Sequence, residues 1–510
     1  MDLAQFGTIS DSVREHASSA PQQPVLIDGD RNLSYAALDT LMDRVAAALQ
    51  RDGLRVGEAI AICADMSIEY AVVFLGALRA GAVVAPLAPG STPESLARML
   101  LDAQAKILFA DKTTGTMFDS LVASGVARVA LDGSSVGRSL DEWMARTNQH
   151  PAPVHIDPQT PFNIIYSSGT TGEPKGIVQP HGMRWAQVCR AENWGYRPDT
   201  VALLSTPLYS NTTLVVFFPA ISYGSTVVLM PKFNAGEFLK LAQSHGATHT
   251  MLVPVQYQRL MARQDFDSFD LSSFQFKFCT SAPFAANLKA DVLKRWPGGL
   301  VELYGMTEGG GSCMLEAHKH PNKLHTVGKP LSGNDIRLIS DSGEELSPGQ
   351  TGEVVGHSPA MMTGYHRQPD KTRETEWFDC TGKRFIRTGD IGRFDDEGFL
   401  TLVDRKKDMI ISGGFNVYPS DLESTLREHD AVLEVAVIGV PSENWGETPV
   451  AFVVRNSGSQ VENDELLQWA NQRLAKTQRI AAIHFLAELP RSAIGKVLKR
   501  ELRESCCQFE

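Results

Sequence analysis

The chain has 510 residues, of which 43% are hydrophobic and 21% are charged, so it is long enough for more than one domain and apolar enough for a large core. Its net charge of −11 argues against a nucleic-acid-binding surface as its main function. The 7 cysteines form no CxxC pair and no zinc-ligand spacing, which favours a reducing compartment and predicts a cytoplasmic protein.

The N-terminal part of the chain alternates strand-like and helix-like runs. Residues 59–64 predict a strand, 67–81 a helix and 82–88 the next strand. The apolar stretch 71–88 contains Arg79 and two glycines, so it predicts a buried helix and strand and no membrane span. Because no basic end precedes an apolar run at the N-terminus, we expect no signal peptide.

The same alternation continues to about residue 320. A buried strand is expected at 162–166, and residues 276–283, 285–296 and 300–308 predict a strand, a helix and another strand. Strands that alternate with helices are typical of parallel sheets covered by helices. The sequence therefore predicts an α/β fold.

The C-terminal part has a different character. Residues 326–403 contain short strand-like runs separated by turn residues, which predicts a β-rich subdomain. Polarity rises around Asp404, and the following segment has its own core pattern. We predict a large N-terminal domain at 1–404 and a small, mobile α+β domain at 405–510. Ser420 and Glu423 have the spacing of a capping box, which predicts that Ser420 caps a helix.

The stretch YSSGTTGEPKG, residues 166–176, follows the predicted strand at 162–166. Small residues let backbone N–H groups approach a polyphosphate closely, and serine and threonine add hydroxyl donors. Taken alone, the loop fits a ligand-free turn equally well. A Walker A loop is disfavoured, because Pro174 precedes Lys175 and no Gly-Lys pair of the chain has the required upstream glycine.

Nine segments, of which this loop is one, resemble in order those of the acyl-adenylate-forming superfamily: acyl-CoA synthetases, aryl-CoA ligases, luciferases and peptide-synthetase adenylation domains. They extend over nearly the whole chain and look closest to AMP-forming aryl- and medium-chain acyl-CoA ligases. The other segments are LSYAALD (33–39), LRAGAVVAPL (78–87), TSAPF (280–284), YGMTE (304–308), TGEVVGHSPAMMTGY (351–365), RTGD (387–390), DRKKDMIISGGFNVYPSDLE (404–423) and PRSAIGKVLKREL (490–502).

The resemblance implies an AMP-forming acid–thiol ligase that uses ATP, Mg²⁺ and coenzyme A. A carboxylate attacks the α-phosphate of ATP to give acyl-AMP and pyrophosphate, and a thiol then attacks the mixed anhydride to give a thioester and AMP. Adenylation joins two anions, so cations and oriented N–H groups must offset their charge.

The resemblance also assigns the ATP-binding residues. Glu308 is the expected Mg²⁺ ligand, and Thr307 is expected on the phosphate; an exposed acidic loop residue is the plain alternative for Glu308. Asp390 is expected to bind the ribose with Arg405 beside it, and Tyr304 to stack on the adenine; a buried core tyrosine is the alternative for Tyr304. The phosphate cradle comprises Ser167, Ser168, Gly169, Thr170, Thr171 and Gly172, with Lys175 near it.

The small domain carries the remaining roles. Lys496 resembles the adenylation lysine, and Asp404 the hinge about which the domain turns between the two half-reactions. Lys499 and Arg500 are expected to lie on the surface. The thiol-side residues implied by the resemblance are Gly413, Gly414, Trp445, Lys476 and Arg479.

The acyl pocket departs from the family pattern. Ser210 stands where relatives commonly carry histidine, which predicts a smaller and differently polar pocket floor. An aromatic-Lys-x-Pro segment is also missing near residue 477, so Lys476 and Arg479 are expected to replace its CoA contacts. The pocket residues implied are Tyr209, Ser210, Asn211, Thr280, Ser281, Ala282, Gly305 and Met306.

The predicted substrate is a mostly apolar monocarboxylic acid, either aromatic or of medium chain length, because no extra basic residue lies in the pocket motifs. Two alternatives stay open. One is a stand-alone adenylating enzyme that loads a carrier-protein thiol; the other is a non-catalytic binding protein with the same fold. The oligomeric state is open, with a homodimer among the options, and neither a nucleic-acid partner nor a membrane span is expected.

Overall fold

The computed structural model describes residues 5–118, 125–167, 174–412, 415–442, 445–475, 478–492 and 495–506. The chain forms two compact units. The first contains residues 1–324, 330–335 and 356–386, and the second contains 325–329, 336–355 and 387–510. Residues 387–404 thus group with the C-terminal part of the chain, whereas the sequence assigned them to the large domain. Asp404 as the point of rotation stays a prediction.

The first unit contains two sheets. In one, the order β15-β14-β13-β12-β10-β11-β1-β2 combines a parallel centre with antiparallel edges. Its strands are β1 (Pro24–Asp28), β2 (Arg31–Ser34), β10 (Val201–Leu204), β11 (Thr226–Leu229), β12 (His249–Leu252), β13 (Phe276–Cys279), β14 (Gly299–Gly305) and β15 (Ser312–Glu316).

The other sheet of the first unit has the order β19-β9-β8-β4-β3-β5-β6-β7. Its strands β3 to β8 are parallel where they pair, and β8 and β9 form an antiparallel hairpin. Its strands are β3 (Ala59–Cys63), β4 (Val83–Pro86), β5 (Ile107–Ala110), β6 (Ala127–Ala130), β7 (Arg138–Ser139), β8 (Pro161–Ser167), β9 (Lys175–Pro180) and β19 (Gly364–Tyr365).

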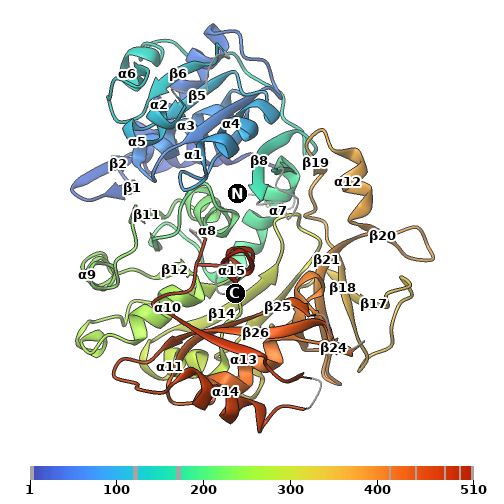
Figure 1. Cartoon of the computed structure of the whole chain (residues 1–510). Coiled ribbons are helices and arrows are strands. Elements are labelled where there is room, and N and C mark those ends of the chain that lie inside the picture. Colours follow the sequence, from blue (N-terminus) through green and yellow to red (C-terminus); the bar gives the residue numbers. More distant parts are fainter. Residues whose placement is uncertain are drawn as a thin grey trace. The chain divides into compact units, whose positions relative to one another are not determined.

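Helices cover both sheets, and Figure 1 shows several of them beside β5 and β6. One hydrophobic core contains side chains of both sheets and of the helices α2, α3 and α8. The helices of the unit are α1 (Ile9–Ser19), α2 (Tyr35–Arg51), α3 (Ile68–Arg79), α4 (Pro93–Asp102), α5 (Lys112–Met117), α6 (Leu140–Trp143), α7 (His181–Arg190), α8 (Asn211–Ser222), α9 (Ala235–His245), α10 (Pro254–Met261), α11 (Ala286–Arg295) and α12 (Pro369–Glu374).

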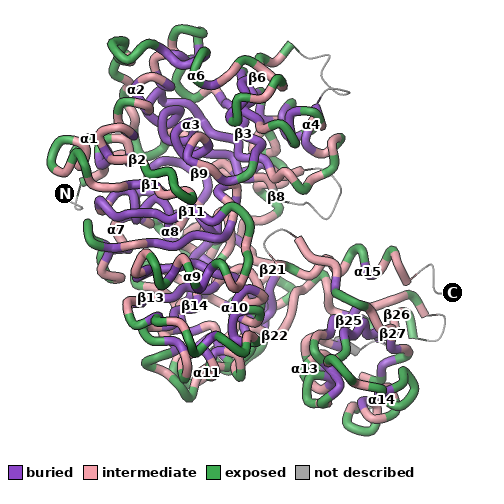
Figure 2. The backbone as a smooth tube through the Cα atoms, turned by 90° about the vertical axis from the view of Figure 1, so that its left-hand side faces the viewer, coloured by how far each residue is buried: buried purple, intermediate pink, exposed green. Residues whose placement is uncertain are grey.

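The helix α3 shows how the sequence specifies this core. Ser67 caps its N-terminus by accepting a hydrogen bond from the Tyr70 N–H, and every residue of the helix except Glu69 is buried. A Cβ at Gly76 would lie 2.6 Å from Cβ of Val45, so glycine permits α2 and α3 to approach closely. Figure 2 shows α3 in the purple of buried residues.

A membrane span requires a helix of sufficient length and hydropathy, and none of the helices of the described residues meets both requirements.

The C-terminal α+β part of the second unit contains one sheet. Its strand order is β24-β23-β26-β25, and β27 pairs in parallel with β26. Alternate residues of β25 face two cores: Val435 and Val437 pack with α13 and α14, and Ala436 and Ile438 pack with Leu502 of α15. The elements are β23 (Ile410–Ser412), β24 (Phe415–Val417), α13 (Pro419–Arg427), β25 (Val432–Ser442), β26 (Gly446–Arg455), α14 (Asn463–Asn471), β27 (Ala482–Leu486) and α15 (Lys499–Cys506).

The β-rich segment contains short strands as predicted. In the first unit, β20 pairs with the first residues of β21, and in the second unit the rest of β21 pairs with β22. The strands are β16 (Lys329–Pro330), β17 (Asp335–Ile339), β18 (Thr351–His357), β20 (Glu376–Phe378), β21 (Arg384–Phe394) and β22 (Leu400–Arg405). The predicted fold class, a large α/β part with a β-rich segment and a smaller α+β part, is confirmed.

Candidate active site

The glycine-rich loop connects the two strands of the β8–β9 hairpin. Tyr166 pairs with Gly176, and Ser167 with Lys175, so the hairpin holds the two ends of the loop together at the end of a core strand. The Tyr166 hydroxyl anchors this end by donating to Asp102 Oδ2 at 2.6 Å. The predicted cradle residues Ser168, Gly169, Thr170, Thr171 and Gly172 lie outside the described residues, as does the side chain of Ser167.

Tyr365 brings the end of this hairpin together with Glu308. The Tyr365 hydroxyl donates to Glu308 Oε1 at 2.9 Å, and Nζ of Lys175 lies 5.4 Å from the centroid of the Tyr365 ring. Residues 175, 308 and 365 are far apart in the sequence, yet they meet within the first unit. Sequence reasoning missed Tyr365 as a site residue, although it closes the quoted segment 351–365.

Backbone contacts also hold the turn that carries Glu308. The Met362 N–H donates to the Glu308 carbonyl oxygen at 2.8 Å. Gly309 follows with a φ of +73°, and a Cβ at this position would lie 2.0 Å from the carbonyl oxygen of Ala360. A side chain is therefore excluded at residue 309, and the turn packs directly against residues 360–362.

The predicted acyl-pocket residues surround the N-terminus of α8 and the carboxyl ends of β13 and β14. Ser210 is buried and caps α8 by accepting from the Thr212 N–H at 3.3 Å, while the Oγ atoms of Thr212 and Ser281 lie 2.6 Å apart. Thr280 donates to the Leu303 carbonyl at 2.7 Å. In open parallel sheets, ligands commonly bind beyond these strand ends.

Several pocket residues have distinctive surroundings. Ser281 has a φ of +82°, a left-handed conformation that costs a non-glycine residue free energy and is often found at functional sites. Burial raises the pKa of Tyr209 to about 12, and the nearby Asp65 adds to this shift. Met306 packs against Tyr365, and Ala282 is partly buried, whereas Gly305 is exposed.

The remaining predicted ATP residues of the second unit meet on β21 and β22. Asp390 pairs with Arg405 across the two strands, and Nε of Arg405 lies 2.9 Å from Oδ1 of the buried Asp390. The arginine thus fixes the carboxylate that the sequence assigns to the ribose. In the first unit, Tyr304 precedes Gly305, the last residue of β14, and is partly buried, so neither of its predicted roles is decided.

Lys496 is an exposed residue of the second unit, shortly before α15. The Ser492 N–H donates to the Lys496 carbonyl oxygen at 2.8 Å, and the Lys496 N–H donates to Oγ of Ser492 at 3.2 Å. Although the residue as a whole is exposed, removal of water from the ammonium group lowers its pKa to about 8, and the neighbouring Arg405 and Lys407 contribute. The surroundings therefore make the ammonium form less stable than in water, and a bound anion would stabilise it.

Asp404 accepts a hydrogen bond from the first turn of α13. Its Oδ2 accepts from the Ser420 N–H at 2.9 Å, and removal from water raises the pKa of the carboxyl group. The capping-box prediction for Ser420 is wrong, because α13 begins at Pro419 and its N-cap, Tyr418, makes no side-chain cap. Ser420 is already inside the helix, so a carboxylate from β22 satisfies its N–H group.

The surface prediction for Lys499 is wrong. Its Nζ lies 2.9 Å from Oε1 of Glu423, and its side chain is only 19% exposed. Glu423 is held in turn by the Val437 N–H, so this ion pair links α13, α15 and β25. Arg500 is exposed as predicted and pairs with Glu504.

The thiol-side residues are only partly described. Trp445 is 53% exposed and adjoins Gly446, which pairs with Ser412. Arg479 is also exposed. Gly413, Gly414 and Lys476 lie outside the described residues, so their roles stay predictions.

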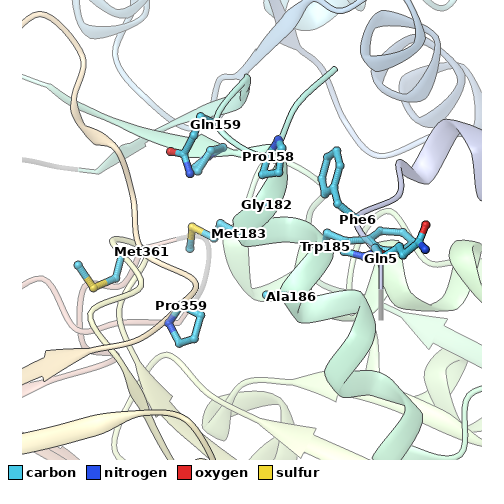
Figure 3. A pocket seen from close by; sticks show the side chains of 11 residues that line it. Gln5, Phe6, Pro158, Gln159, Gly182, Met183, Trp185, Ala186, Pro359 and Met361 are labelled. Atoms are coloured by element: carbon cyan, nitrogen blue, oxygen red, sulfur yellow. Dashed lines mark hydrogen bonds between the residues drawn. The ribbon is translucent and has the colours of Figure 1, made fainter. Parts of the chain in front are cut away.

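A cavity of about 320 Å³ in the first unit contains none of the predicted site residues. Figure 3 shows Phe6 and Trp185 on one side of it and Met183 and Met361 on the other. The Trp185 indole N–H donates to the Gln5 carbonyl at 2.9 Å, so this wall is a packed structural contact.

The model of the AMP-binding enzyme family matches residues 13–366, and that of the AMP-binding enzyme C-terminal domain matches residues 421–496. The first match alone extends over more than half of the chain. The chain belongs to the AMP-binding enzyme family. The predicted family resemblance is therefore confirmed.

Relatives over nearly the full length include CoA ligases. The indoleacetate–CoA ligase of Aromatoleum aromaticum is 33% identical, over 97% of this chain and 98% of its own. The feruloyl-CoA synthase of Amycolatopsis sp is 34% identical over 96% of each chain. A fatty acid–[acyl-carrier-protein] ligase, ScoC of Streptomyces coeruleorubidus, is 30% identical over 98% of this chain and 96% of its own.

Solved structures agree with these relatives. ATP-bound MatB from Rhodopseudomonas palustris superposes with a TM-score of 0.87 at 29% identity, over 98% of this chain and 99% of that chain. This member of the AMP-binding enzyme family is an AMP-forming acid–CoA ligase that uses ATP and CoA. The carrier-protein alternative is not favoured, although ScoC carries such a name.

Proposed function

We propose that the enzyme activates a mostly apolar aromatic monocarboxylic acid and transfers its acyl group to CoA. Two relatives similar over almost the whole chain are named for acids with an aromatic ring, indoleacetate and ferulate. The pocket candidates Tyr209, Ser210, Asn211 and Ser281 carry no formal charge. A medium-chain aliphatic acid is the remaining option for the same pocket.

The observation that supports the site best is the meeting of Lys175, Glu308 and Tyr365. It combines the end of a glycine-rich loop, a cation and a carboxylate, as nucleotide phosphates require. Among the described residues, no three His, Cys, Asp or Glu side chains converge on a metal position. This fits Mg²⁺, which commonly binds through one carboxylate together with nucleotide phosphates and waters.

In the proposed first step, a carboxylate oxygen of the acid forms a bond to the α-phosphorus of ATP, and the bond to the pyrophosphate breaks. Glu308 would hold Mg²⁺, which offsets phosphate charge when bound. Thr307 would donate a hydrogen bond to a phosphate oxygen, and Lys175 would bind near the cradle. The Lys496 ammonium would offset repulsion between the carboxylate and the α-phosphate.

In the proposed second step, the sulfur of CoA forms a bond to the carbonyl carbon of the acyl-AMP, and AMP leaves with the electrons of the broken C–O bond. Asp390 would accept hydrogen bonds from the ribose hydroxyls throughout. Trp445, Arg479 and Lys476 would contact CoA, beside a backbone path at Gly413 and Gly414. Rotation about Asp404 would exchange the C-terminal groups between the two steps.

The test is a panel of acids assayed for pyrophosphate release, with and without CoA. It should include indoleacetate, ferulate, 4-coumarate, octanoate and malonate. We expect an aromatic acid to give the highest kcat/KM, and AMP release to depend on CoA. A preference for octanoate would reassign the acid, and AMP release driven only by a carrier protein with a free thiol would overturn CoA as the acceptor. A homodimer and a cytoplasmic location stay predictions.

A further inference from the structure

The core of the first unit contains a fully buried arginine, Arg184 of α7, which is 1% exposed. Its guanidinium carbon lies 5.8 Å and 5.7 Å from the ring centroids of Phe162 and Phe218. No Asp or Glu in the described parts of the chain pairs with it. Removal from water lowers its pKa to about 9, which still leaves the group charged at neutral pH. A buried cation without a counter-ion is costly unless other groups satisfy it.

Three neutral amide side chains satisfy Arg184. Its Nε and Nη2 each lie 3.2 Å from Oδ1 of Asn163, its Nη1 donates to Oε1 of Gln187 at 2.9 Å, and its Nη2 also donates to Oε1 of Gln179. Asn163 and Gln179 are completely buried, on β8 and β9. The arginine thus fixes the direction of two amide groups in the core.

Gln179 connects this buried polar cluster to the candidate site. With its Oε1 held by Arg184, its NH₂ group must point the opposite way. The same Nε2 atom lies 2.6 Å from the carbonyl oxygen of Thr307 and 3.3 Å from Oδ1 of Asn211. One side chain therefore joins the turn before Glu308 to the first residue of α8.

We infer that Gln179, oriented by Arg184, is a positioning residue for adenylation: it holds the Thr307–Glu308 turn in register with the acyl-side wall at Asn211. The inference rests on the proposed roles of those three residues. Preorganised groups act only if their backbone is fixed to within a fraction of an ångström. Thr307 is held here through its carbonyl oxygen, which leaves its hydroxyl available to a phosphate.

Two nearly isosteric variants separate this role from a merely structural one. Gln179→Glu keeps an acceptor for Arg184, but an ionised carboxylate cannot donate to the Thr307 carbonyl. Asn163→Asp is the matched control: it also places a carboxylate beside Arg184, it does not touch Thr307, and it removes only Nδ2, which has no hydrogen-bond partner among the described residues. Gln179→Leu, which adds no charge, serves if the glutamate variant fails to fold.

The experiment compares acyl-AMP formation, thioester formation from supplied acyl-AMP, and thermal unfolding, with the best acid of the panel as probe. We expect Gln179→Glu and Gln179→Leu to lower kcat of adenylation at least about tenfold, with a smaller change in the KM for MgATP and in the second step. Asn163→Asp should keep adenylation near the unchanged level and unfold at an equal or higher temperature.

Two results would overturn the inference: normal adenylation in both Gln179 variants, or an equal loss in Asn163→Asp. The second result would mean that the buried polar cluster acts only through the stability of the core. A separate control tests the proposed function itself. If Glu308→Gln abolishes adenylation while the Gln179 variants are normal, the proposed site stands and only the positioning role fails. If Glu308→Gln is also normal, the assignment of the turn fails.

Discussion

The two units hold their candidate catalytic groups in opposite ways. In the first, the carboxylate of Glu308 accepts from Tyr365 and its backbone from Met362, so the group is fixed before any substrate binds. In the second, Lys496 is an exposed residue whose pKa is lowered by removal of water from its ammonium group and by the nearby Arg405 and Lys407. The comparison suggests a fixed phosphate site and a lysine whose ammonium form a bound anion would stabilise further.

The largest effect is expected at the fixed carboxylate. Glu308→Gln should lower adenylation by about 10²–10³, because a charged ligand is lost where phosphate charge develops. The benefit of added Mg²⁺ should fall with it, as a titration of MgCl₂ in the pyrophosphate assay would reveal. Glu316→Gln is the matched control, since this carboxylate pairs with the exposed Lys319. Near-normal adenylation in Glu308→Gln would remove Glu308 from the site.

A smaller effect on kcat/KM is expected at the predicted acyl pocket of the first unit. Ser210→His adds bulk at a buried position and should reject larger acids relative to small ones by about 1–3 kcal/mol. It also removes the cap of α8, which costs about 0.5–2 kcal/mol of stability. Ser210→Ala separates the two, because it removes the cap without adding bulk. An equal fall of kcat/KM for every acid would show that Ser210 does not line the pocket.

Loss of the hydrogen bond from Tyr365 to Glu308 should lower adenylation less than loss of the Glu308 carboxylate. Tyr365→Phe keeps the ring beside Lys175 but removes the donor to Glu308, so adenylation should fall about tenfold. The matched control is Tyr70→Phe, because the buried Tyr70 hydroxyl has no hydrogen-bond partner among the described residues. Single-turnover acyl-AMP formation compares them. Equal rates for the two variants would mean that Glu308 is fixed without Tyr365.

The smallest effect concerns pH. The pKa of Lys496 is lowered from its ordinary value to about 8, so its ammonium is present below that pH and lost above it. Adenylation kcat/KM, which reports the free enzyme, should therefore decline as pH rises through about 8. Lys496→Arg stays charged and should lack this decline, whatever its absolute rate. A profile of the same shape in both proteins would assign the decline to another group.

Much of the fold could be predicted because local patterns and tertiary packing agree. The strand at 162–166 and the helix at 67–81 are confirmed as β8 and α3, since mostly apolar runs are buried there. The core pattern predicted after Asp404 has the same basis, because both faces of β25 are covered.

The contacts that orient the site could not be predicted, because they join polar residues from distant segments. Asn163, Gln179 and Arg184 carry no local pattern that would indicate a shared cluster, and Tyr365 meets Glu308 only through the fold. Ser420 misled for a related reason: the spacing of a capping box was present, but Pro419 begins the helix and Asp404 supplies the acceptor.

The contrast between a fixed carboxylate and an exposed lysine with a lowered pKa is tested most directly by a single-turnover assay of both half-reactions on Lys496→Ala. We predict that acyl-AMP formation falls by about 10²–10³, because one charge contact between the carboxylate and the α-phosphate is lost. Thioester formation from supplied acyl-AMP and CoA should stay close to that of the unchanged protein, since that step joins no two anions. An equal loss in both half-reactions would contradict the account and make Lys496 a structural residue.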